Sequence, residues 1–247
     1  MSFAKLSGDY NPLHIDNVLA RRLIFGSVVV HGVFSLLWAL DNWLQDKTGY
    51  ILLDGIKCIF LNPIRINEEV CYFIKKEIDG YVEIALLVGD TIVTSIEIKW
   101  STTRNHENDP VSNEIPKHSD CIVLSANNIR TVSGELPLYF DIDVASALFT
   151  KKLVTLIPTL QIAQLLATTR LVGMNCPGLH SIYSKLDLTF EETTEKKHVL
   201  THKVTKVHKQ YNKVIQKVTS LNMTGLVTAF LRPPPQQQIC FNNLDQK

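Results

Sequence analysis

The chain has no excess of charge of either sign. Its 247 residues include 25 lysines and arginines against 24 aspartates and glutamates, which gives a formal net charge of +1. Proteins that bind nucleic acids or anionic membranes usually carry a strong positive charge. The composition therefore favours neither partner, and we predict no binding of nucleic acid.

Cysteines are few, and their arrangement argues against two common classes of protein. The five cysteines are an odd number with no C-x-x-C spacing and no clustered histidines, at Cys58, Cys71, Cys121, Cys176 and Cys240. Disulfide-stabilised secreted domains and structural zinc sites depend on paired or closely spaced cysteines. We expect reduced, structural thiols, and no metal site built from cysteines, in a cytoplasmic protein.

The sequence also lacks the usual targeting and membrane-spanning segments. The first apolar run begins only at Leu23 and has no small-residue cleavage pattern, so no secretory signal is expected. Residues 23–40 carry no charged side chain, and this is about the minimum length for a spanning helix. Because polar residues and glycines occur within this run, we interpret it as an apolar arm followed by a buried helix, and we predict no membrane span.

What the chain does contain is enough apolar sequence for a substantial core. Hydrophobic residues make up 45% of the chain and charged residues 20%, a composition that is typical of globular proteins. The length allows one large domain or two domains of ordinary size.

A cluster of turn-forming residues opens the chain. Residues 7–12 include serine, glycine, aspartate, asparagine and proline, so Phe3 to His14 is predicted to be a rigid loop rather than a helix or strand. Pro12 fixes its own φ and biases the preceding residue toward an extended conformation. Such a loop would hold Asp9 and His14 as an acid/base pair that positions a water molecule and moves its protons. Since Asp-x4-His is a weak pattern, a capped loop with an ordinary half-buried histidine is the alternative.

The residues that follow extend this pattern. The segment Ser-Gly-Asp-Tyr-Asn-Pro-Leu-His-Ile-Asp at residues 7–16 is followed by Ala20, Phe25-Gly26 and Val30-His31-Gly32. Taken together, these residues resemble the signature of the MaoC-like, or hydratase 2, family. The resemblance covers the chain to about residue 45, and its motifs are specific.

The resemblance implies a hot-dog fold and a lyase that needs no cofactor. Its reaction would be (R)-specific hydration of trans-2-enoyl thioesters, or dehydration of 3-hydroxyacyl thioesters, in fatty-acid or polyketide-type metabolism. The acyl group would be carried on coenzyme A or on acyl carrier protein. Two alternatives stay open, a non-catalytic acyl-binding or scaffold protein and a hot-dog thioesterase.

The same resemblance assigns roles to four residues. The catalytic aspartate and histidine of the family fall on Asp9 and His14, and its motif asparagine falls on Asn11. The glycine whose backbone amide faces the thioester oxygen falls on Gly32. An amide at the start of a buried helix is an unpaired donor at the positive end of the helix dipole, which suits a developing negative charge.

Other positions either extend this set or depart from the family. His31 and Phe25 are further substrate-binding candidates, and for His31 packing beneath the loop is the alternative. Many relatives carry a serine about two turns into the central helix, where this chain has Leu40. Ser35 lies about one turn earlier, so that role is not transferred to it. Only eight residues precede Asp9, so the strand that usually precedes the motif is expected to be missing or replaced, or the start codon to be misplaced.

An apolar segment predicts the centre of the fold. Residues 32–45 are apolar on nearly every face, whereas a surface helix would show a single stripe. A strongly curved sheet wrapped around one helix, as in a hot-dog unit, would bury it. The strands of that sheet are expected at residues 56–61, 70–78, 81–88 and 91–100, with hairpin turns at Asp79-Gly80 and Gly89-Asp90.

The rest of the chain repeats this order. A polar stretch with two prolines, residues 101–120, is expected to be a linker. An apolar helix at residues 157–171 then precedes four strand-like runs, at residues 181–190, 199–207, 211–221 and 223–231. We therefore predict an α+β double hot-dog in which two antiparallel sheets each wrap around a long buried helix.

The two predicted units differ in their chemistry. Residues 1–105 carry the hydratase motif, residues 121–232 do not, and residues 233–247 are predicted to be a disordered tail. The second unit is expected to be catalytically silent and to form a pseudo-dimer with the first, and a homodimer of the whole chain is left open. Its helix would widen the acyl site or help to grip the carrier, with Leu160, Gln161 and Gln164 as candidates, although core packing is the favoured role for Leu160. Residues 174–178 would form a structural turn.

Overall fold

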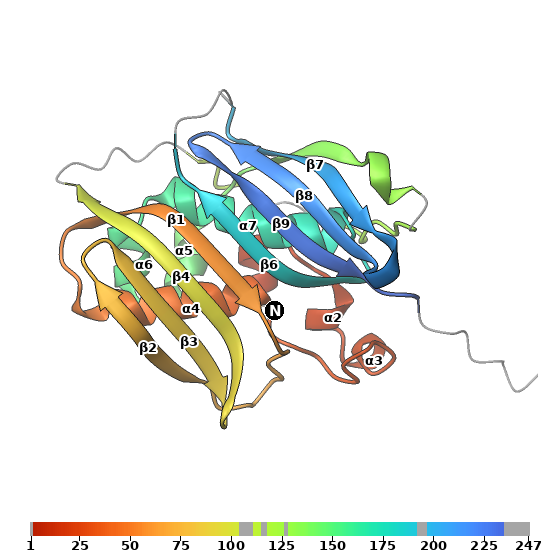
Figure 1. The fold of residues 1–247 in the computed structure, drawn as a ribbon, viewed down its shortest axis with the longest axis horizontal. Coiled ribbons are helices and arrows are strands. Elements are labelled where there is room, and N and C mark those ends of the chain that lie inside the picture. Colours follow the sequence, from red (N-terminus) through yellow and green to blue (C-terminus); the bar gives the residue numbers. More distant parts are fainter. Residues whose placement is uncertain (1, 104–110, 115–117, 126–127, 192–196, 235–247) are drawn as a thin grey trace, which may run out of the picture.

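Nine strands form one continuous antiparallel sheet, in the order β2-β3-β4-β1-β6-β9-β8-β7-β5 (Figure 1). The computed structural model describes residues 2–103, 111–114, 118–125, 128–191 and 197–234. The strands are β1 (Tyr50–Phe60), β2 (Cys71–Ile78), β3 (Tyr81–Val88), β4 (Thr91–Thr103), β5 (Ser133–Pro137), β6 (Ser181–Thr189), β7 (Val199–His208), β8 (Lys213–Ser220) and β9 (Met223–Leu231).

The sheet has an N-terminal part, which ends with β4, and a C-terminal part, which begins with β5. The two parts join where β1 pairs with β6, over Gly55–Ile59 and Lys185–Thr189. The prediction of two antiparallel sheets is therefore not confirmed, because the strands of the two parts pair side by side into one sheet. Had each part kept its own sheet, β1 and β6 would have been edges with unpaired backbone groups, and their pairing removes both edges.

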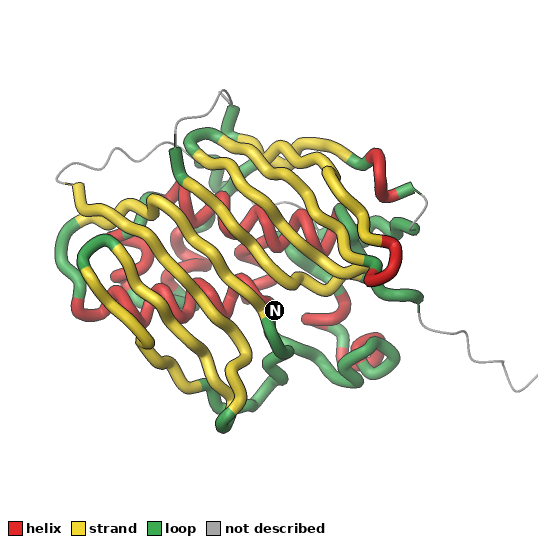
Figure 2. Tube along the Cα trace, in the orientation of Figure 1, coloured by secondary structure: helices red, strands yellow, loops and turns green. Residues whose placement is uncertain are grey.

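The two long helices, α4 and α7, lie side by side on one face of the sheet (Figure 2). The helices are α1 (Ser2–Ser7), α2 (Pro12–Ile15), α3 (Asn17–Ala20), α4 (Gly32–Trp43), α5 (Ile142–Ser146), α6 (Lys151–Leu156) and α7 (Thr159–Arg170), with 3₁₀ turns at Leu44–Asp46, Ile129–Thr131 and Lys209–Tyr211 and a π-helical turn at Leu171–Asn175. None of the helices in the described ranges is long and apolar enough to cross a membrane.

Helix α4 is buried on nearly all sides, as its sequence predicted. Val33, Leu36, Leu37 and Leu40 are completely buried, and the helix contacts β4, α6 and α7. Complete burial of one such side chain contributes about 1.5–3 kcal/mol. The apolar character of this segment therefore fixes α4 between the sheet and the neighbouring helices.

Helix α7 differs from α4 because many of its buried residues are polar. Gln161, Gln164, Thr168, Thr169 and Arg170 are all buried. A buried polar group is costly unless it has a hydrogen-bond partner. Each of these side chains donates a hydrogen bond to another part of the protein or to its own helix.

Near the start of β1, the side chain of Gln161 forms the backbone hydrogen bonds that a neighbouring strand would otherwise form. Its Nε2 donates to the carbonyl oxygen of Leu53 at 2.8 Å, and the Leu53 amide donates to its Oε1 at 3.0 Å. A bulge separates Leu53 from Gly55, and β6 pairs with β1 only from Gly55 onward. Gln161 and Gln164 do not border the pocket described below, so they do not line it as predicted. Leu160 is buried in the core, which agrees with the packing role favoured for it.

The opening segment contains two short helices where the sequence predicted one continuous loop. In α1 the side chains of Phe3, Ala4 and Leu6 are buried, and the Ser7 hydroxyl donates to the carbonyl oxygen of Phe3 at 2.8 Å. This buried apolar face outweighs the turn preference of the flanking residues. Pro12 stands in the first turn of α2, where its missing N–H has no cost. Only the connection between α1 and α2 is a loop.

The regular elements largely follow the predicted ones. The helix and strand runs predicted from the sequence are all present, and β1 extends back to Tyr50. Gly80 and Gly89 adopt φ of +73° and +55° in the two predicted hairpin turns. The sequence did not predict β5, which pairs with β7. The predicted linker lies partly outside the described residues, as does the predicted tail beyond residue 234.

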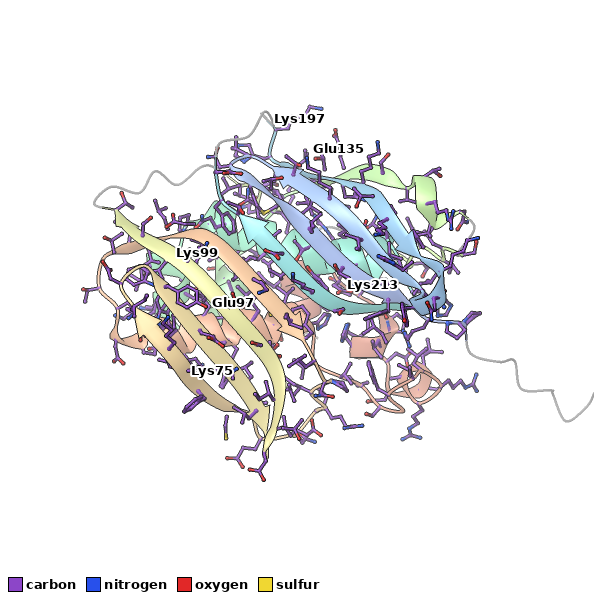
Figure 3. The ribbon with its side chains drawn as sticks, in the orientation of Figure 1. Lys75, Glu97, Lys99, Glu135, Lys197 and Lys213 are labelled. Carbon is purple, nitrogen blue, oxygen red and sulfur yellow. The ribbon has the colours of Figure 1, made fainter. Side chains whose placement is uncertain are left out.

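The face of the sheet opposite the helices carries many charged side chains (Figure 3). Lys57 and Glu97 form an ion pair at 2.7 Å across β1 and β4, and Lys75 and Glu83 form one at 3.5 Å across β2 and β3. Exposed pairs of this kind contribute little to stability, because water screens their attraction. This face is therefore a solvated surface, and the core lies on the side of the helices.

We predict that Gln161→Met lowers the free energy of unfolding by about 2–4 kcal/mol. The substitution leaves the buried amide and carbonyl of Leu53 without partners, and each unsatisfied group costs about 1–3 kcal/mol. Urea denaturation measures the change. Gln164→Met is the matched control, because Gln164 donates one bond only, to the Leu221 carbonyl oxygen. A loss for Gln161→Met no larger than that of the control would contradict the prediction.

Candidate active site

A short loop between α1 and α2 places Asp9 in the interior. Only 1% of the Asp9 surface is exposed. Gly8, which precedes it, has φ of +72°, and a Cβ there would lie 2.1 Å from the Tyr139 hydroxyl. A side chain at position 8 would thus be strained and would clash, so glycine allows the close turn that carries Asp9 inward.

The carboxylate of Asp9 receives hydrogen bonds from both parts of the chain. The Thr169 hydroxyl donates to Oδ2 at 2.7 Å, and the backbone amide of Asn11 donates to Oδ1 at 3.2 Å. Burial raises the pKa of Asp9 above its ordinary value of 3.8, although His14 and these two donors act in the opposite direction. The carboxylate therefore accepts a proton more readily than an exposed one.

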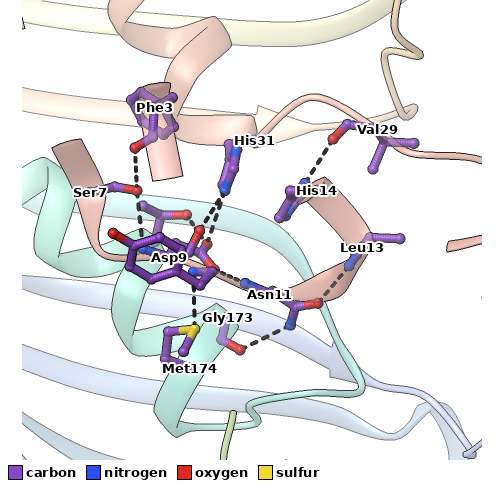
Figure 4. Close-up of polar contacts among 12 residues, drawn as sticks. Phe3, Ser7, Asp9, Asn11, Leu13, His14, Val29, His31, Gly173 and Met174 are labelled. Atoms are coloured by element: carbon purple, nitrogen blue, oxygen red, sulfur yellow. Dashed lines mark hydrogen bonds and ion pairs between the residues drawn. The ribbon is translucent and has the colours of Figure 1, made fainter. Parts of the chain in front are cut away.

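Asn11 fastens the loop to the C-terminal part of the chain. Its Nδ2 donates to the carbonyl oxygen of Gly173 at 2.9 Å (Figure 4) and to that of Gly178 at 3.3 Å. Its Oδ1 accepts a bond from the Leu13 amide and caps α2. All of these bonds hold the backbone in place, and Asn11 does not border the pocket described below.

The imidazole of His14 is held in one tautomer. Its Nδ1 lies 2.8 Å from the carbonyl oxygen of Val29 (Figure 4). A carbonyl can only accept, so Nδ1 carries the proton and Nε2 keeps its lone pair. Burial lowers the pKa of His14 below 6.5, despite opposing effects of Asp9 and of the Val29 bond. His14 is thus a neutral ring with a free acceptor nitrogen near neutral pH.

His31 packs beneath the loop. Its Nε2 donates to the backbone carbonyl oxygen of Asp9 at 3.0 Å, and its ring stacks on His14 with 3.8 Å between centroids. Burial and the neighbouring His14 lower the pKa of His31 well below 6.5. His31 does not border the pocket, so the structure favours the packing alternative for this residue.

Gly32 is the first residue of α4 and borders the pocket with Phe25 and His14. The amide of a first helical residue has no acceptor within its own helix. A Cβ at Gly32 would lie 2.9 Å from ring atoms of Phe60. Glycine therefore lets Phe60 close over this helix terminus while the amide stays available to a ligand.

A pocket of about 280 Å³ lies at the junction of the two parts of the chain. From the N-terminal part it is lined by Asp9, Leu13, His14, Phe25, Val29, Val30, Gly32, Ser35, Phe60, Leu61, Asn62, Pro63, Ile64 and Thr94. From the C-terminal part it is lined by Thr169, Val172, Gly173, Ser181, Ile182, Tyr183, Ser184 and Phe230. Four of the six candidate residues, Asp9, His14, Phe25 and Gly32, thus border one pocket.

Sequence reasoning missed Thr169 and Gly173. Thr169 is separated from Asp9 by 160 positions, and a single threonine in a helix gives no distinctive signal. A Cβ at Gly173 would lie 2.1 Å from Asp9 Oδ1, so glycine makes room for the carboxylate. Met174, expected only in a structural turn, accepts a bond from the Tyr10 amide through its sulfur at 3.1 Å. The segment that follows α7 therefore supports the loop directly.

The side chains of Asp9, His14 and His31 stand close together, but their hydrogen bonds argue against a role in binding a metal. The Asp9 carboxylate and one ring nitrogen each of His14 and His31 lie within 4.8 Å of one another. Two of the four ring nitrogens, Nδ1 of His14 and Nε2 of His31, already bond backbone carbonyl oxygens. The arrangement is therefore built mainly from hydrogen bonds among the residues themselves.

Comparison with known proteins finds relatives of the N-terminal part of the chain. A family model described as MaoC like domain matches residues 1–83. The (R)-specific enoyl-CoA hydratase of Aeromonas caviae is 30% identical over 101 residues, which are 41% of this chain and 70% of that protein. The 3-hydroxybutyryl-CoA dehydratase of Methylorubrum extorquens is 26% identical over 120 residues, which are 45% of this chain and 76% of that protein.

The similarity extends to the architecture of the whole chain. A MaoC domain protein from Chloroflexus aurantiacus J-10-fl has a TM-score of 0.59 at 9% identity, over 94% of this chain and 91% of that chain. The fold is thus that of a hot-dog protein, and the hydratase and dehydratase relatives place the chain in the lyase class. The chain belongs to the MaoC-like dehydratase family, which confirms the resemblance inferred from its motif.

We predict that Asp9→Asn raises the melting temperature by at least ~2 °C at pH 8. The folded-state pKa of Asp9 is raised above 3.8, so ionisation of Asp9 destabilises the folded state as pH rises from 3.8 through that pKa. Asparagine removes this cost, and the advantage should shrink toward pH 4. Thermal melts at both pH values test this against Asp90→Asn in an exposed turn. A variant that melts below wild type at pH 8 would contradict the prediction.

Proposed function

We propose that the protein catalyses (R)-specific hydration of trans-2-enoyl thioesters, or the reverse dehydration of 3-hydroxyacyl thioesters. The observation that carries this proposal is the meeting of the Asp9 carboxylate, the free Nε2 of His14 and the start of α4 at one pocket. Two proton acceptors beside a free backbone donor are what addition of water to a conjugated thioester requires.

The spacing of the two acceptors suits a single water molecule. Two acceptors that bond the same water at ordinary lengths and a tetrahedral angle lie about 4.5 Å apart. The Asp9 carboxylate and a ring nitrogen of His14 lie within 4.8 Å of each other. In our proposal the water sits between them, with its oxygen directed toward the β-carbon of the substrate.

The proposed reaction balances without a further reactant. The water oxygen bonds to the β-carbon, and the C=C π electrons move toward the thioester carbonyl. The proton that leaves the water goes to one member of the Asp9–His14 pair. The pair returns a proton to the α-carbon as the carbonyl re-forms, and dehydration is the same sequence in reverse. Raising the pKa of Asp9 and lowering that of His14 makes transfer in both directions easier.

Gly32 is proposed to stabilise the enolate-like oxygen. Its amide stands at the positive end of α4, where a free donor and the helix dipole both favour negative charge. Phe25 and Phe60 border the same pocket and would exclude water from the acyl chain. Asn11 would act indirectly, by fastening the loop that carries Asp9.

Coenzyme A is proposed as the carrier and a short acyl chain as the substrate. Both curated relatives described above carry CoA in their names. A pocket of about 280 Å³ is at the lower end of the range for small-molecule sites. Crotonyl-CoA is therefore the first substrate to test, and the same acyl group on acyl carrier protein is the comparison.

We also propose that the chain is a tandem of two hot-dog units, residues 1–105 and 121–232, joined as a pseudo-dimer. Each part contributes one long helix, and the strands that follow it pair in one sheet. The second unit would lack a catalytic pair of its own, since the motif of the first has no counterpart there. A homodimer of the chain and a cytoplasmic location stay predictions.

Two other functions give different results in the same assay. A non-catalytic acyl-binding protein would bind crotonyl-CoA without loss of enoyl absorbance. A thioesterase would release free thiol, since its water attacks the carbonyl carbon. One spectrophotometric assay with a thiol reagent in a parallel sample separates the three functions.

We predict that Asp9→Asn and His14→Ala each reduce hydration of crotonyl-CoA by at least ~10², since a positioned acid or base contributes about 10²–10⁴. The kcat/KM measured from enoyl absorbance tests this. His208→Ala, at the end of β7 and away from the pocket, is the control. Near wild-type turnover in either variant, at a melting temperature no lower than that of wild type, would refute the role of that residue.

A further inference from the structure

One polar side chain of the C-terminal part, that of Thr169, forms a hydrogen bond with the Asp9 carboxylate. Its hydroxyl donates to Oδ2 at 2.7 Å, a short bond of the kind found with ionised acceptors. The backbone amide of Asn11 donates to Oδ1 at the longer distance of 3.2 Å. Thr169 therefore makes the shorter of the two bonds that orient the carboxylate.

The use of the Thr169 hydroxyl is unusual for a threonine inside a helix. A helical threonine commonly donates to a carbonyl oxygen of its own preceding turn, as the adjacent Thr168 does to Leu165 at 2.7 Å. Thr169 instead reaches across to Asp9, although only 3% of its surface is exposed. Both hydroxyls are buried, and only one of them serves the site.

The end of α7 holds Thr169 in this position. A π-helical turn, Leu171–Asn175, follows the helix directly, and such turns often occur at functional sites. Within it Gly173 lies against Asp9, and its carbonyl oxygen accepts the bond from Asn11. Thr169 and Gly173, one turn apart, thus clasp the carboxylate and its loop from the same side.

We propose that Thr169 is a positioning residue, which holds the Asp9 carboxylate in its working orientation and keeps it available as a proton acceptor. The proposal rests on the function proposed above for Asp9. It extends that function to the C-terminal part, which would complete the catalytic site with a hydroxyl group although it carries no motif of its own.

The chemical effect of this bond has a definite sign. A hydroxyl that donates to a carboxylate favours the ionised form, and so it opposes the effect of burial on the pKa of Asp9. Removal of the hydroxyl should therefore raise that pKa further. The fraction of Asp9 able to accept a proton would then fall at any pH near the pKa.

Other titratable groups near Asp9 would not mask this effect. His14 and His31 face it from the N-terminal part, and Cys121 and Tyr139 interact with it from the other side. The pKa values of Cys121 and Tyr139 are raised to about 12, and that of His31 is well below 6.5. The pKa of His14 is also below 6.5, so any titration within this group between about pH 6.5 and pH 9 belongs to Asp9.

The first test measures kcat/KM for crotonyl-CoA from about pH 5 to pH 9 in Thr169→Val, Thr169→Ser and the control Thr168→Val. We expect Thr169→Val to move the acid limb of the profile upward by about one pH unit, and so to lower kcat/KM about tenfold at pH values on that limb. Thr169→Ser should keep the wild-type position of the acid limb and the wild-type activity, because serine retains the hydroxyl. Thr168→Val should leave the limb in place.

An unmoved acid limb in Thr169→Val, at a matched melting temperature, would overturn the proposal. If that variant is too unstable to assay, Thr169→Ala removes the same hydroxyl with less bulk, and an unmoved limb there has the same meaning. A purely structural threonine would lower the melting temperature of the variants and leave the pH profile unchanged.

A second test does not depend on turnover. The loss of unfolding free energy caused by Thr169→Val should be larger at pH 8 than at pH 4, because the bond stabilises ionised Asp9. In an Asp9→Asn background the loss should be the same at both pH values. If wild type fails to hydrate the thioester while this difference persists, the proposed function fails and the role of Thr169 in the ionisation of Asp9 stands. If Thr169→Val caused the same loss of unfolding free energy at pH 4 and at pH 8 in the wild-type background as well, the role of Thr169 would be overturned.

Discussion

Taking the carboxylate of Asp9 out of water has a free-energy cost that only surrounding donors can offset. Those donors come from Asn11 in the same loop and from Thr169 at the end of α7. Gly173 supplies the space that the carboxylate occupies. The loop, the helix end and the sheet that joins them are therefore interdependent, and a shift of any one of them would leave a buried charge without partners.

Features encoded locally were predictable from the sequence. Helix α4 follows from an apolar pattern on every face, and the hairpins of β2 to β4 follow from glycine turns between β-favouring runs. Helix α1 was missed because turn formers at its end masked the buried face of Phe3, Ala4 and Leu6. Strand β5 is five residues long and contains a glycine and a proline, so it has no strand signal of its own.

The candidate site divides in the same way. Asp9, His14 and Gly32 lie in one compact motif, so their meeting at a pocket could be expected from the first 32 residues. The contribution of Thr169 in α7 could not be expected from the sequence, since it depends on a tertiary contact across 160 positions. Gln161 shows the same limit: a buried glutamine on an apolar helix suggested a ligand contact, yet it bonds the backbone of β1.

The order of the site's components along the chain bears on its assembly during synthesis. The motif of residues 9–14 is translated first, and the residues that clasp it, Thr169 to Gly178, follow about 160 positions later. At roughly 5–20 residues per second this interval is on the order of ten seconds. Throughout it, β1 has no β6 beside it and Asp9 has no hydroxyl partner from α7. A nascent chain that stops early would thus hold the whole motif and still lack a completed site.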